Sequence, residues 1–343
     1  MPGKSVKGKR CLVTGGTGTV GRWVVRELLK HEPDVVRIVD TDETGLFDFA
    51  QELGGYSAER VRFLVGDVRD RDRMVRATEH IDLVIHCAAL KHVELSEYNP
   101  FEAVKTNILG AQSLIEACLD NEVDKVVLTS SDKAANPSNT MGATKLVSEK
   151  LFVAANFAKG PRRTKFSCVR FGNVIGSRGS MVPLFRRQIE EGGPVTITDP
   201  NMTRFVLTQQ QVLDLVLEAV DRMMGGEVFV PRMPSLRIRD LIDVMLKRLA
   251  GANGGRSKVA IKTIGTKPGE KLYEELITEE EATRTYQVGD LLVILSPVKE
   301  SLTAEALAYT KHPRPRGGRF TSHDAKKMSA AEIGRLLSAE RLL

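Results

Sequence analysis

The sequence has few cysteines and no long apolar run. Its four cysteines show no C-x-x-C spacing and no clustered histidines near them, which predicts neither a metal site nor a disulfide framework and favours a reducing compartment. No window reaches about eighteen consecutive apolar residues, the length that a membrane helix needs. The basic first ten residues lead directly into a short apolar run instead of a signal-peptide core. We therefore expect a soluble cytoplasmic protein without a leader, a membrane segment or a metal.

A long run of one charge is also absent. The formal net charge of the 343 residues is +6, because 50 Lys and Arg are spread among 44 Asp and Glu. Scattered charge of this kind is typical of a solvated surface, so we expect no nucleic-acid partner and only a mild attraction for an anionic small molecule. The length fits one large α/β unit with an appendage, or two domains.

Glycine is concentrated directly after the first apolar run. The residues CLVT at 11–14 are followed by GGTGTVG at 15–21 and then by a helical pattern that Pro33 closes. A strand, a glycine turn and a helix in this order let the backbone approach a pyrophosphate, and the free N–H groups of the helix start favour the anion. The residues predicted to bind a dinucleotide here are Gly15, Thr17, Gly18, Thr19, Val20 and Gly21.

An acidic residue ends the second apolar run, VVRIVD. Asp40 lies nineteen residues beyond Gly21, about where a carboxylate meets the adenosine ribose, and it would repel a ribose phosphate, so NAD is favoured over NADP. Further short apolar runs alternate with helical stretches, which predicts an α/β fold with a doubly wound parallel sheet. The carboxyl ends of these runs add Asp67, Val68, Ala88 and Ala89 to the predicted cofactor site.

The fifth apolar run brings chemically active groups to the same rim. Ser131, Asp132 and Lys133 stand at its end, and Met141 and Lys145 are spaced to share one face of the next predicted helix. A hydroxyl, an acid and two lysines near the nicotinamide are suited to proton transfer. These five residues form the predicted catalytic set.

Six motifs carry a resemblance to one enzyme family over nearly the whole chain. They are TGGTGTVG, LKHVELSEYNPFEAVKTNILG, SSDKAANPSNTMGATK, RFGNVIGSRGSMVPLF, DPNMTRFVLT and KPGEKLYEEL. The chain resembles the extended short-chain dehydrogenase/reductases, and among them the nucleotide-sugar 4,6-dehydratases of polysaccharide biosynthesis that carry methionine in place of the active-site tyrosine. The resemblance implies an NAD-binding Rossmann domain at residues 1–172. Residues 173–343 are expected to form mainly a smaller mixed α/β substrate-binding subdomain, with some segments returning to the Rossmann core, and the chain is expected to form a homo-oligomer.

The resemblance also implies a reaction. A sugar is oxidised at carbon 4, loses water across carbons 5 and 6, and regains hydride at carbon 6, so NAD is a resident cofactor. Lys133 is then the base at carbon 5, Asp132 the acid at carbon 6, and Lys145 a ligand of the nicotinamide ribose. Because the Met141 thioether cannot accept a proton, Asp132 is expected to carry the carbon 4 hydroxyl proton to the carbon 6 oxygen. A sugar that covers the site, together with the charge of a nearby Lys145, is expected to lower the pKa of Lys133 toward neutrality.

The substrate site follows from the same resemblance. It implies that residues from several segments hold the sugar, the diphosphate, the ribose and the base, and that Asn107 supports the sheet beside the cofactor. The expected substrate-binding residues are Lys91, Glu94, Asn173, Arg178, Val182, Thr196, Arg204 and Glu270, and the cofactor set also takes in Lys91, Asn107 and Lys145.

UDP-GlcNAc is the expected substrate, and several alternatives stay open. The sequence does not decide the base, so GDP-GlcNAc is an alternative, as is dehydration with inversion at carbon 5. A nucleotide-sugar epimerase is disfavoured, because an epimerase acting at carbon 4 needs no acid at carbon 6. An NAD-binding regulator without catalytic activity is a further alternative. Near the end of the chain, MSAAEIGRLL has the form of a capping box and predicts a docked helix.

Overall fold

A nine-stranded sheet forms the centre of the computed structural model, which describes residues 2–56, 59–177, 179–252, 259–298, 302 and 305–342. The strand order is β14-β15-β10-β6-β5-β4-β1-β2-β3. The strands from β3 to β10 run parallel, whereas β15 and β14 are antiparallel to their neighbours. Their bounds are β1 (Arg10–Thr14), β2 (Val35–Asp40), β3 (Val61–Val65), β4 (Leu83–His86), β5 (Lys125–Thr129), β6 (Lys165–Val169), β10 (Val228–Pro231), β14 (Thr285–Val288) and β15 (Leu291–Ile294).

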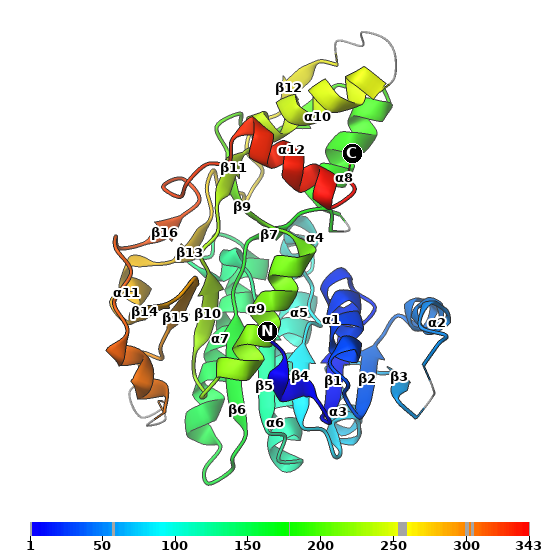
Figure 1. Ribbon diagram of the computed structural model, residues 1–343, viewed down its shortest axis with the longest axis vertical. Helices are drawn as coiled ribbons and strands as arrows, with labels where there is room; N and C mark the ends of the chain where they lie inside the picture. Colours follow the sequence, from blue (N-terminus) through cyan, green and yellow to red (C-terminus); the bar gives the residue numbers. More distant parts are fainter. Residues whose placement is uncertain are drawn as a thin grey trace.

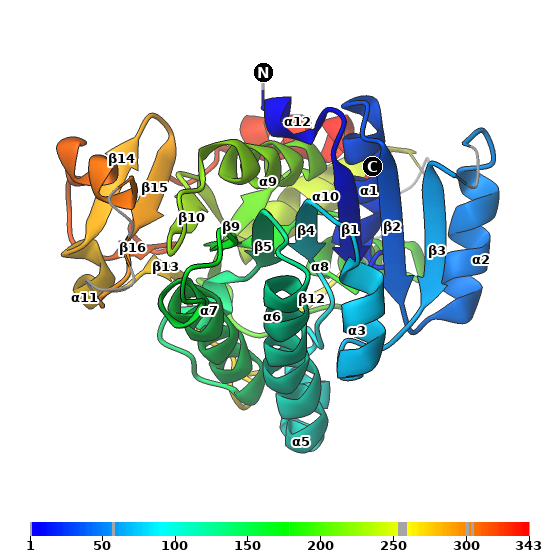
Figure 2. The ribbon, with the colours of Figure 1, turned by 90° about the horizontal axis from the view of Figure 1, so that it is seen from below.

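Helices cover both faces of this sheet (Figure 2). On one face lie α3 (Arg71–Thr78), α6 (Gly110–Asp120) and α7 (Thr140–Ala158), and on the other lie α1 (Thr19–Lys30) and α9 (Gln209–Arg222). Because neither face is left to solvent, β1, β4 and β5 are buried at nearly every position and need apolar side chains throughout. The predicted doubly wound parallel sheet is therefore confirmed.

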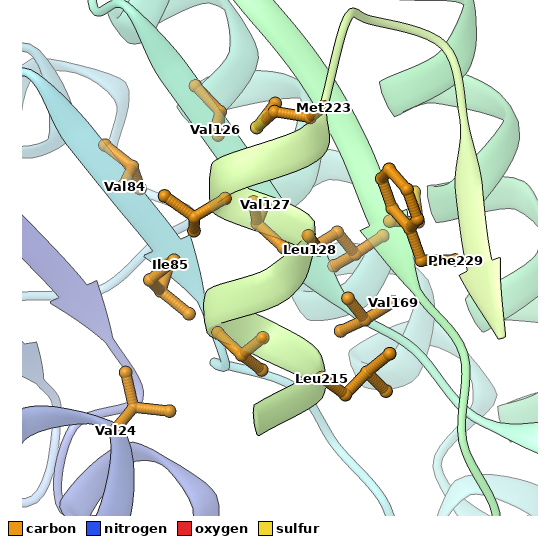
Figure 3. Packing of buried hydrophobic residues seen from close by; sticks show 14 of the residues in the cluster. Val24, Val84, Ile85, Val126, Val127, Leu128, Val169, Leu215, Met223 and Phe229 are labelled. Carbon is orange, nitrogen blue, oxygen red and sulfur yellow. The ribbon is translucent and has the colours of Figure 1, made fainter. Parts of the chain in front are cut away.

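The core beneath α9 shows how this packing works. Figure 3 shows the helix lying across the central strands, with Leu215 and the following Met223 over side chains such as Ile85, Val127 and Val169. All of these side chains are almost inaccessible to solvent. Full burial of one such side chain stabilises the fold by about 1.5–3 kcal/mol, so the sheet is a firm support for the residues at its edge.

A second hydrophobic cluster lies beyond the carboxyl edge of the sheet, at the top of Figure 1. It is built by α8 (Met181–Glu190), α10 (Ile238–Ala252), α12 (Ala330–Ala339), β8 (Val195–Ile197), β9 (Thr203–Leu207) and β11 (Ser235–Arg237). The predicted docked tail is confirmed, because the Ser329 and Glu332 side chains form the capping box of α12, and Ile333 and Leu337 are fully buried. The proposed boundary at residue 172 stays a prediction. After this residue, β10, β14 and β15 are strands of the main sheet, and α9 packs on one of its faces.

Smaller elements complete the chain. They are α2 (Glu43–Glu52), α4 (Val93–Tyr98), α5 (Pro100–Ala103), the π-helix η2 (Val104–Leu109), α11 (Glu279–Ala282), β7 (Asn173–Val174), β12 (Ile261–Thr263), β13 (Glu275–Ile277), β16 (Phe320–Thr321) and the short 3-10 helices η1 (Lys4–Val6), η3 (Asp132–Ala134) and η5 (Ala306–Lys311). Within the described ranges, none of the helices has both the length and the apolar character to cross a bilayer. The same ranges contain no group of three or more His, Cys, Asp and Glu side chains placed to hold a metal ion.

Candidate active site

A cavity of about 800 Å³ opens at the carboxyl ends of β1, β2, β4 and β5. The strand order reverses between β1 and β4, and ligands of doubly wound sheets bind at this crevice. The volume falls in the range of about 300–1,000 Å³ that is usual for ligand pockets. Segments that the sequence predicted to bind the cofactor and to carry the catalysis both contribute to its wall.

The glycine turn after β1 forms one side of the cavity. Gly15 has a φ of 67°, and a Cβ atom added there would lie 2.6 Å from the Ala88 Cα. A Cβ atom on Gly21 would lie 2.2 Å from the Gly15 carbonyl oxygen. The helix α1 begins directly after Gly18, and no side chain caps its first N–H groups. The turn therefore needs glycine and presents a helix N-terminus that suits a phosphate.

The carboxylate of Asp40 fixes this turn while it lines the cavity. Its Oδ2 accepts hydrogen bonds from the Thr17 backbone N–H at 3.0 Å and the Thr17 hydroxyl at 2.7 Å. The predicted cofactor residues found in the cavity wall are Gly15, Thr17, Gly18, Thr19, Val20, Gly21, Asp40, Asp67, Val68, Ala88, Ala89, Lys91 and Lys145. Asn107 lies outside the wall. Its side-chain amide bonds both the N–H and the C=O of Leu90, which is itself a wall residue.

Lys133 and Asp132 lie on η3, immediately after β5. The Lys133 ammonium donates a hydrogen bond to Asp132 Oδ1 at 3.0 Å, and the Ser131 hydroxyl donates to the same oxygen at 2.8 Å. Lys133 and Ser131 line the cavity, whereas Asp132 is wholly buried behind them. The other oxygen, Asp132 Oδ2, has no hydrogen-bond partner among the described residues. Its proton-accepting capacity is thus unused.

Glu274 is a site residue that the sequence did not reveal. Its Oε1 lies 3.4 Å from Lys133 Nζ and 3.8 Å from Arg204 Nε, and its side chain is only 3% exposed. We call Asp132, Lys133, Glu274 and Arg204 the Lys133 cluster. The local signal in the sequence is limited to the adjacent glutamates of LYEEL, both of which the structure buries.

The charges of this cluster set the pKa of Lys133 in the protein without substrate. Burial lowers the pKa of Lys133, but the negative charges of Asp132 and Glu274 outweigh burial, and the net result is a raised pKa. The expected lowering of this pKa concerns the site covered by substrate and stays a prediction, whereas without substrate the pKa of Lys133 is raised. The physical reason is that two carboxylates contact this ammonium, a feature that the S-D-K motif alone does not disclose.

Met141 and Lys145 lie together on α7 in the cavity wall, as their spacing predicted. Lys145 Nζ donates a hydrogen bond to the Thr129 carbonyl oxygen at 3.1 Å. Burial lowers the pKa of Lys145 to about 8, against the opposing effects of Cys87, Glu149 and Cys168. The Met141 side chain is 3% exposed and contributes to the cavity wall.

The expected substrate residues are dispersed. Lys91 and Asn173 line the cavity, and Val182 is buried beside Asn173 in a small adjoining hollow. Glu94 is exposed and paired with Lys267. Arg178 lies outside the described residues.

Three further expected substrate residues lie away from the cavity wall. Arg204 contacts Glu270 at 3.7 Å and Glu274 at 3.8 Å. Thr196 exchanges hydrogen bonds with the Gln188 side chain. Their roles toward a nucleotide stay predictions.

Known proteins match this chain over most of its length. The profile of the family described as polysaccharide biosynthesis protein matches residues 11–296. A UDP-N-acetylglucosamine 4,6-dehydratase (inverting) from Campylobacter jejuni is 43% identical over 85% of this chain and 84% of its own. A UDP-glucose 4-epimerase from Rickettsia prowazekii is 36% identical over 96% of this chain and 95% of its own. The X-ray structure of Pen from Bacillus thuringiensis is 41% identical, with a TM-score of 0.91 over 98% of this chain and 99% of that one.

Proposed function

The chain belongs to the polysaccharide biosynthesis protein family, and from this premise we propose that it is an NAD-dependent 4,6-dehydratase of a nucleotide-activated N-acetylhexosamine. The predicted resemblance to extended short-chain dehydrogenase/reductases is confirmed by the relatives and by the fold. One observation carries the proposal. A lysine in the cavity wall is bonded to a buried carboxylate that has an unused oxygen, beside a methionine in the same wall.

The cavity fits NAD at its glycine turn. The close approach of Gly15 to Ala88 leaves no room for a side chain, and the open N-terminus of α1 supplies donors for a pyrophosphate. Asp40 stands where the adenosine ribose is expected, and Lys145 is expected to bind the nicotinamide ribose. NAD bound in this way supplies a hydride acceptor for carbon 4 and returns the hydride to carbon 6.

The proton from the carbon 4 hydroxyl is proposed to reach Asp132 through Ser131. Ser131 lines the cavity and already donates to Asp132 Oδ1, so it can take the substrate proton as it passes its own proton to the carboxylate. Met141 has no acidic proton to exchange, so Asp132 is the group that holds the carbon 4 proton. The reverse transfer then protonates the oxygen that leaves carbon 6.

Lys133 is proposed to remove the carbon 5 proton. It returns the proton to the same face where the configuration is retained, and with inversion solvent supplies a proton to the other face. Its side chain lies in the cavity wall and is 21% exposed, so a substrate in the cavity would cover it. Water loss across carbons 5 and 6 requires this base and the Asp132 acid on the same substrate. The adjacent positions of Lys133 and Asp132 support these roles of base and acid.

UDP-GlcNAc is proposed as the substrate, supported by the name of the 43% identical relative. GDP-GlcNAc is the alternative for the base, and inversion at carbon 5 is supported by the word inverting in that relative's name. The 36% identical relative named a UDP-glucose 4-epimerase supports epimerisation as a second candidate. The buried acid beside Lys133 favours dehydration over epimerisation, because a 4-epimerase expels no hydroxyl.

The test is incubation with UDP-GlcNAc or GDP-GlcNAc and catalytic NAD, followed by mass spectrometry and NMR. A product lighter by one water, formed faster from UDP-GlcNAc, is the expected result. NMR of that product assigns the configuration at carbon 5. An epimerase would give a product of unchanged mass, and no reaction with either nucleotide sugar would contradict the proposed function.

A cytoplasmic location and self-association are proposed as well. Exposed apolar side chains follow one another along α4, α5 and η2, and these support contact with a second copy of the chain. They are Leu95, Tyr98, Phe101, Val104 and Leu109. Light scattering on a sizing column is expected to give at least twice the 37.8 kDa mass of one chain.

A further inference from the structure

A second buried carboxylate, that of Glu274, contacts the proposed base Lys133. We propose that Glu274 is a positioning residue that accepts the Lys133 proton when substrate covers the cavity, leaving a neutral amine for carbon 5. The inference rests on the proposed function and adds a residue to its proton transfers. Glu274 would act only through Lys133, because it does not itself line the cavity.

The backbone holds Glu274 in a fixed position. Its N–H donates to the Ser322 hydroxyl at 3.0 Å, and its C=O accepts from the Ser322 N–H at 2.8 Å. The pairing of β13 with β16 continues directly from these bonds. The carboxylate therefore stays close to Lys133 Nζ while other contacts at the site change.

The carboxylate also has an unused acceptor. Glu274 Oε2 is buried and has no hydrogen-bond partner among the described residues, although the chain is well able to satisfy other buried glutamates. A buried oxygen without a partner costs free energy, so a purely structural role gives no account of it. A role in which Glu274 accepts a proton during the reaction explains why this oxygen has no partner.

Charge explains when the proton would move. Without substrate, the carboxylates of Asp132 and Glu274 keep Lys133 protonated against the opposing charge of Arg204, which lies 3.8 Å from Glu274. Water reaches the 21% of the Lys133 side chain that is exposed. A substrate over Lys133 removes that water, and loss of water favours a neutral acid and amine over two ions. Asp132 already holds the carbon 4 proton, so Glu274 is the carboxylate that accepts the proton of Lys133.

The transfer balances without any added reagent. One N–H bond of the Lys133 ammonium breaks and an O–H bond forms on Glu274. The freed lone pair of the amine takes the carbon 5 proton, and the electrons of that C–H bond pass into the enolate of the 4-ketone. When Lys133 returns the proton to carbon 5, the Glu274 proton returns to the lysine. With inversion, solvent protonates carbon 5 from the other face, Lys133 keeps the proton that it removed, and Glu274 releases its proton to solvent.

The kinetic test is Glu274→Gln, with turnover of UDP-GlcNAc followed across neutral and alkaline pH. The proposal predicts a kcat about 100-fold lower at neutral pH with little change in KM, since Lys133 must then lose its proton to solvent. It also predicts that the variant's kcat rises by about tenfold per pH unit below the Lys133 pKa, whereas the wild-type rate is nearly flat. An unchanged kcat, or an equal loss at every pH, would overturn it.

A matched control is Glu275→Gln, at the next position of the chain. Glu275 is also buried, but its carboxylate accepts a hydrogen bond from the Asn136 side chain, and the ion pairs of Lys133 are with Asp132 and Glu274. This control is expected to keep kcat within about twofold of the wild type at every pH. An equal loss in both variants would show general damage to β13 and would overturn the specific role of Glu274.

A chemical test does not depend on the substrate assignment. Acylation of Lys133, followed by peptide mass spectrometry, measures the neutral fraction of its amine. Removal of the Glu274 charge lowers the pKa of Lys133, so Glu274→Gln is expected to label several-fold faster than wild type at mildly alkaline pH. Equal labelling would overturn the electrostatic link. The wild-type protein could dehydrate neither nucleotide sugar while Glu274→Gln still labels faster than wild type. In that case the proposed function fails, and the electrostatic effect of Glu274 on Lys133 is retained.

Discussion

Two buried ion clusters in this protein are made from the same kinds of residue and differ in how completely they are bonded. The Arg170 cluster, which consists of Arg170, Glu149 and Glu281, joins β6 to α7 and α11 through bonds of 2.5–3.0 Å. The contacts of the Lys133 cluster run from 3.0 to 3.8 Å and leave Asp132 Oδ2 and Glu274 Oε2 without partners in the described part of the chain. The first cluster is suited to holding elements together, and the second has spare capacity for protons.

The difference follows from the cation at each centre. The planar guanidinium of Arg170 meets each carboxylate with two parallel bonds and gives a further one to the Leu276 carbonyl. The ammonium of Lys133 is a point charge that meets one oxygen of each carboxylate. Lysine can also lose its proton within reach of neutral pH, which arginine cannot.

The largest effect is expected from Asp132→Asn. Asparagine keeps the shape and an acceptor for Ser131, but it cannot store the carbon 4 proton, so kcat should fall by about 10²–10⁴. The free energy of unfolding should change little, because Lys133 keeps Glu274 as a partner. Steady-state kinetics and thermal unfolding of the same sample check this. A large loss of stability in Asp132→Asn would contradict the comparison, because the Lys133 cluster would then hold the fold together as the Arg170 cluster does.

The Arg170 cluster should respond in stability. Burial raises the pKa of Glu281, but the charge and hydrogen bonds of Arg170 outweigh it and lower the value to about 2. The free carboxyl group of an unfolded chain titrates higher, so this contribution of about 3 kcal/mol is complete above about pH 4.5 and is lost as the pH falls toward 2.

Glu281→Gln is therefore expected to lower the free energy of unfolding at pH 7 by about 3 kcal/mol and to flatten its decline below about pH 4.5. Urea unfolding at several pH values measures both effects. Activity at 25 °C should stay near that of wild type while the variant is folded. A pH dependence identical to wild type would contradict the role given to Glu281.

A smaller effect on the rate of carbon 4 oxidation is expected from a substitution at Met141. In the Asp132→Asn background, Met141→Tyr places a phenol in the cavity wall, where it can take the carbon 4 hydroxyl proton. Oxidation at carbon 4 should recover by about tenfold, and water loss should not, because the acid for carbon 6 is still missing. Stopped-flow absorbance of the reduced nicotinamide and product mass separate the two steps. No recovery would place the carbon 4 proton elsewhere.

The sequence predicted the parts of the site that one continuous segment builds. The turn from Gly15 to Gly21, the carboxylate of Asp40 and the pair Met141 and Lys145 all reach the cavity wall, because strand ends and helix spacing fix them locally. Glu274 was missed, and Arg204 was predicted as a substrate-binding residue without its contact to Glu274. Their positions depend on how β9 and the chain around β13 pack against η3, and no local pattern records that contact.

The most direct test of the open Lys133 cluster is a single turnover of Lys133→Gln with UDP-GlcNAc in heavy water. Deuterium at carbon 5 and the mass of the nucleotide sugar are measured together. Oxidation at carbon 4 is expected to proceed in this variant, while carbon 5 gains no deuterium and no water is lost. Deuterium entering carbon 5 at the wild-type rate would contradict it, because another group would then be the base.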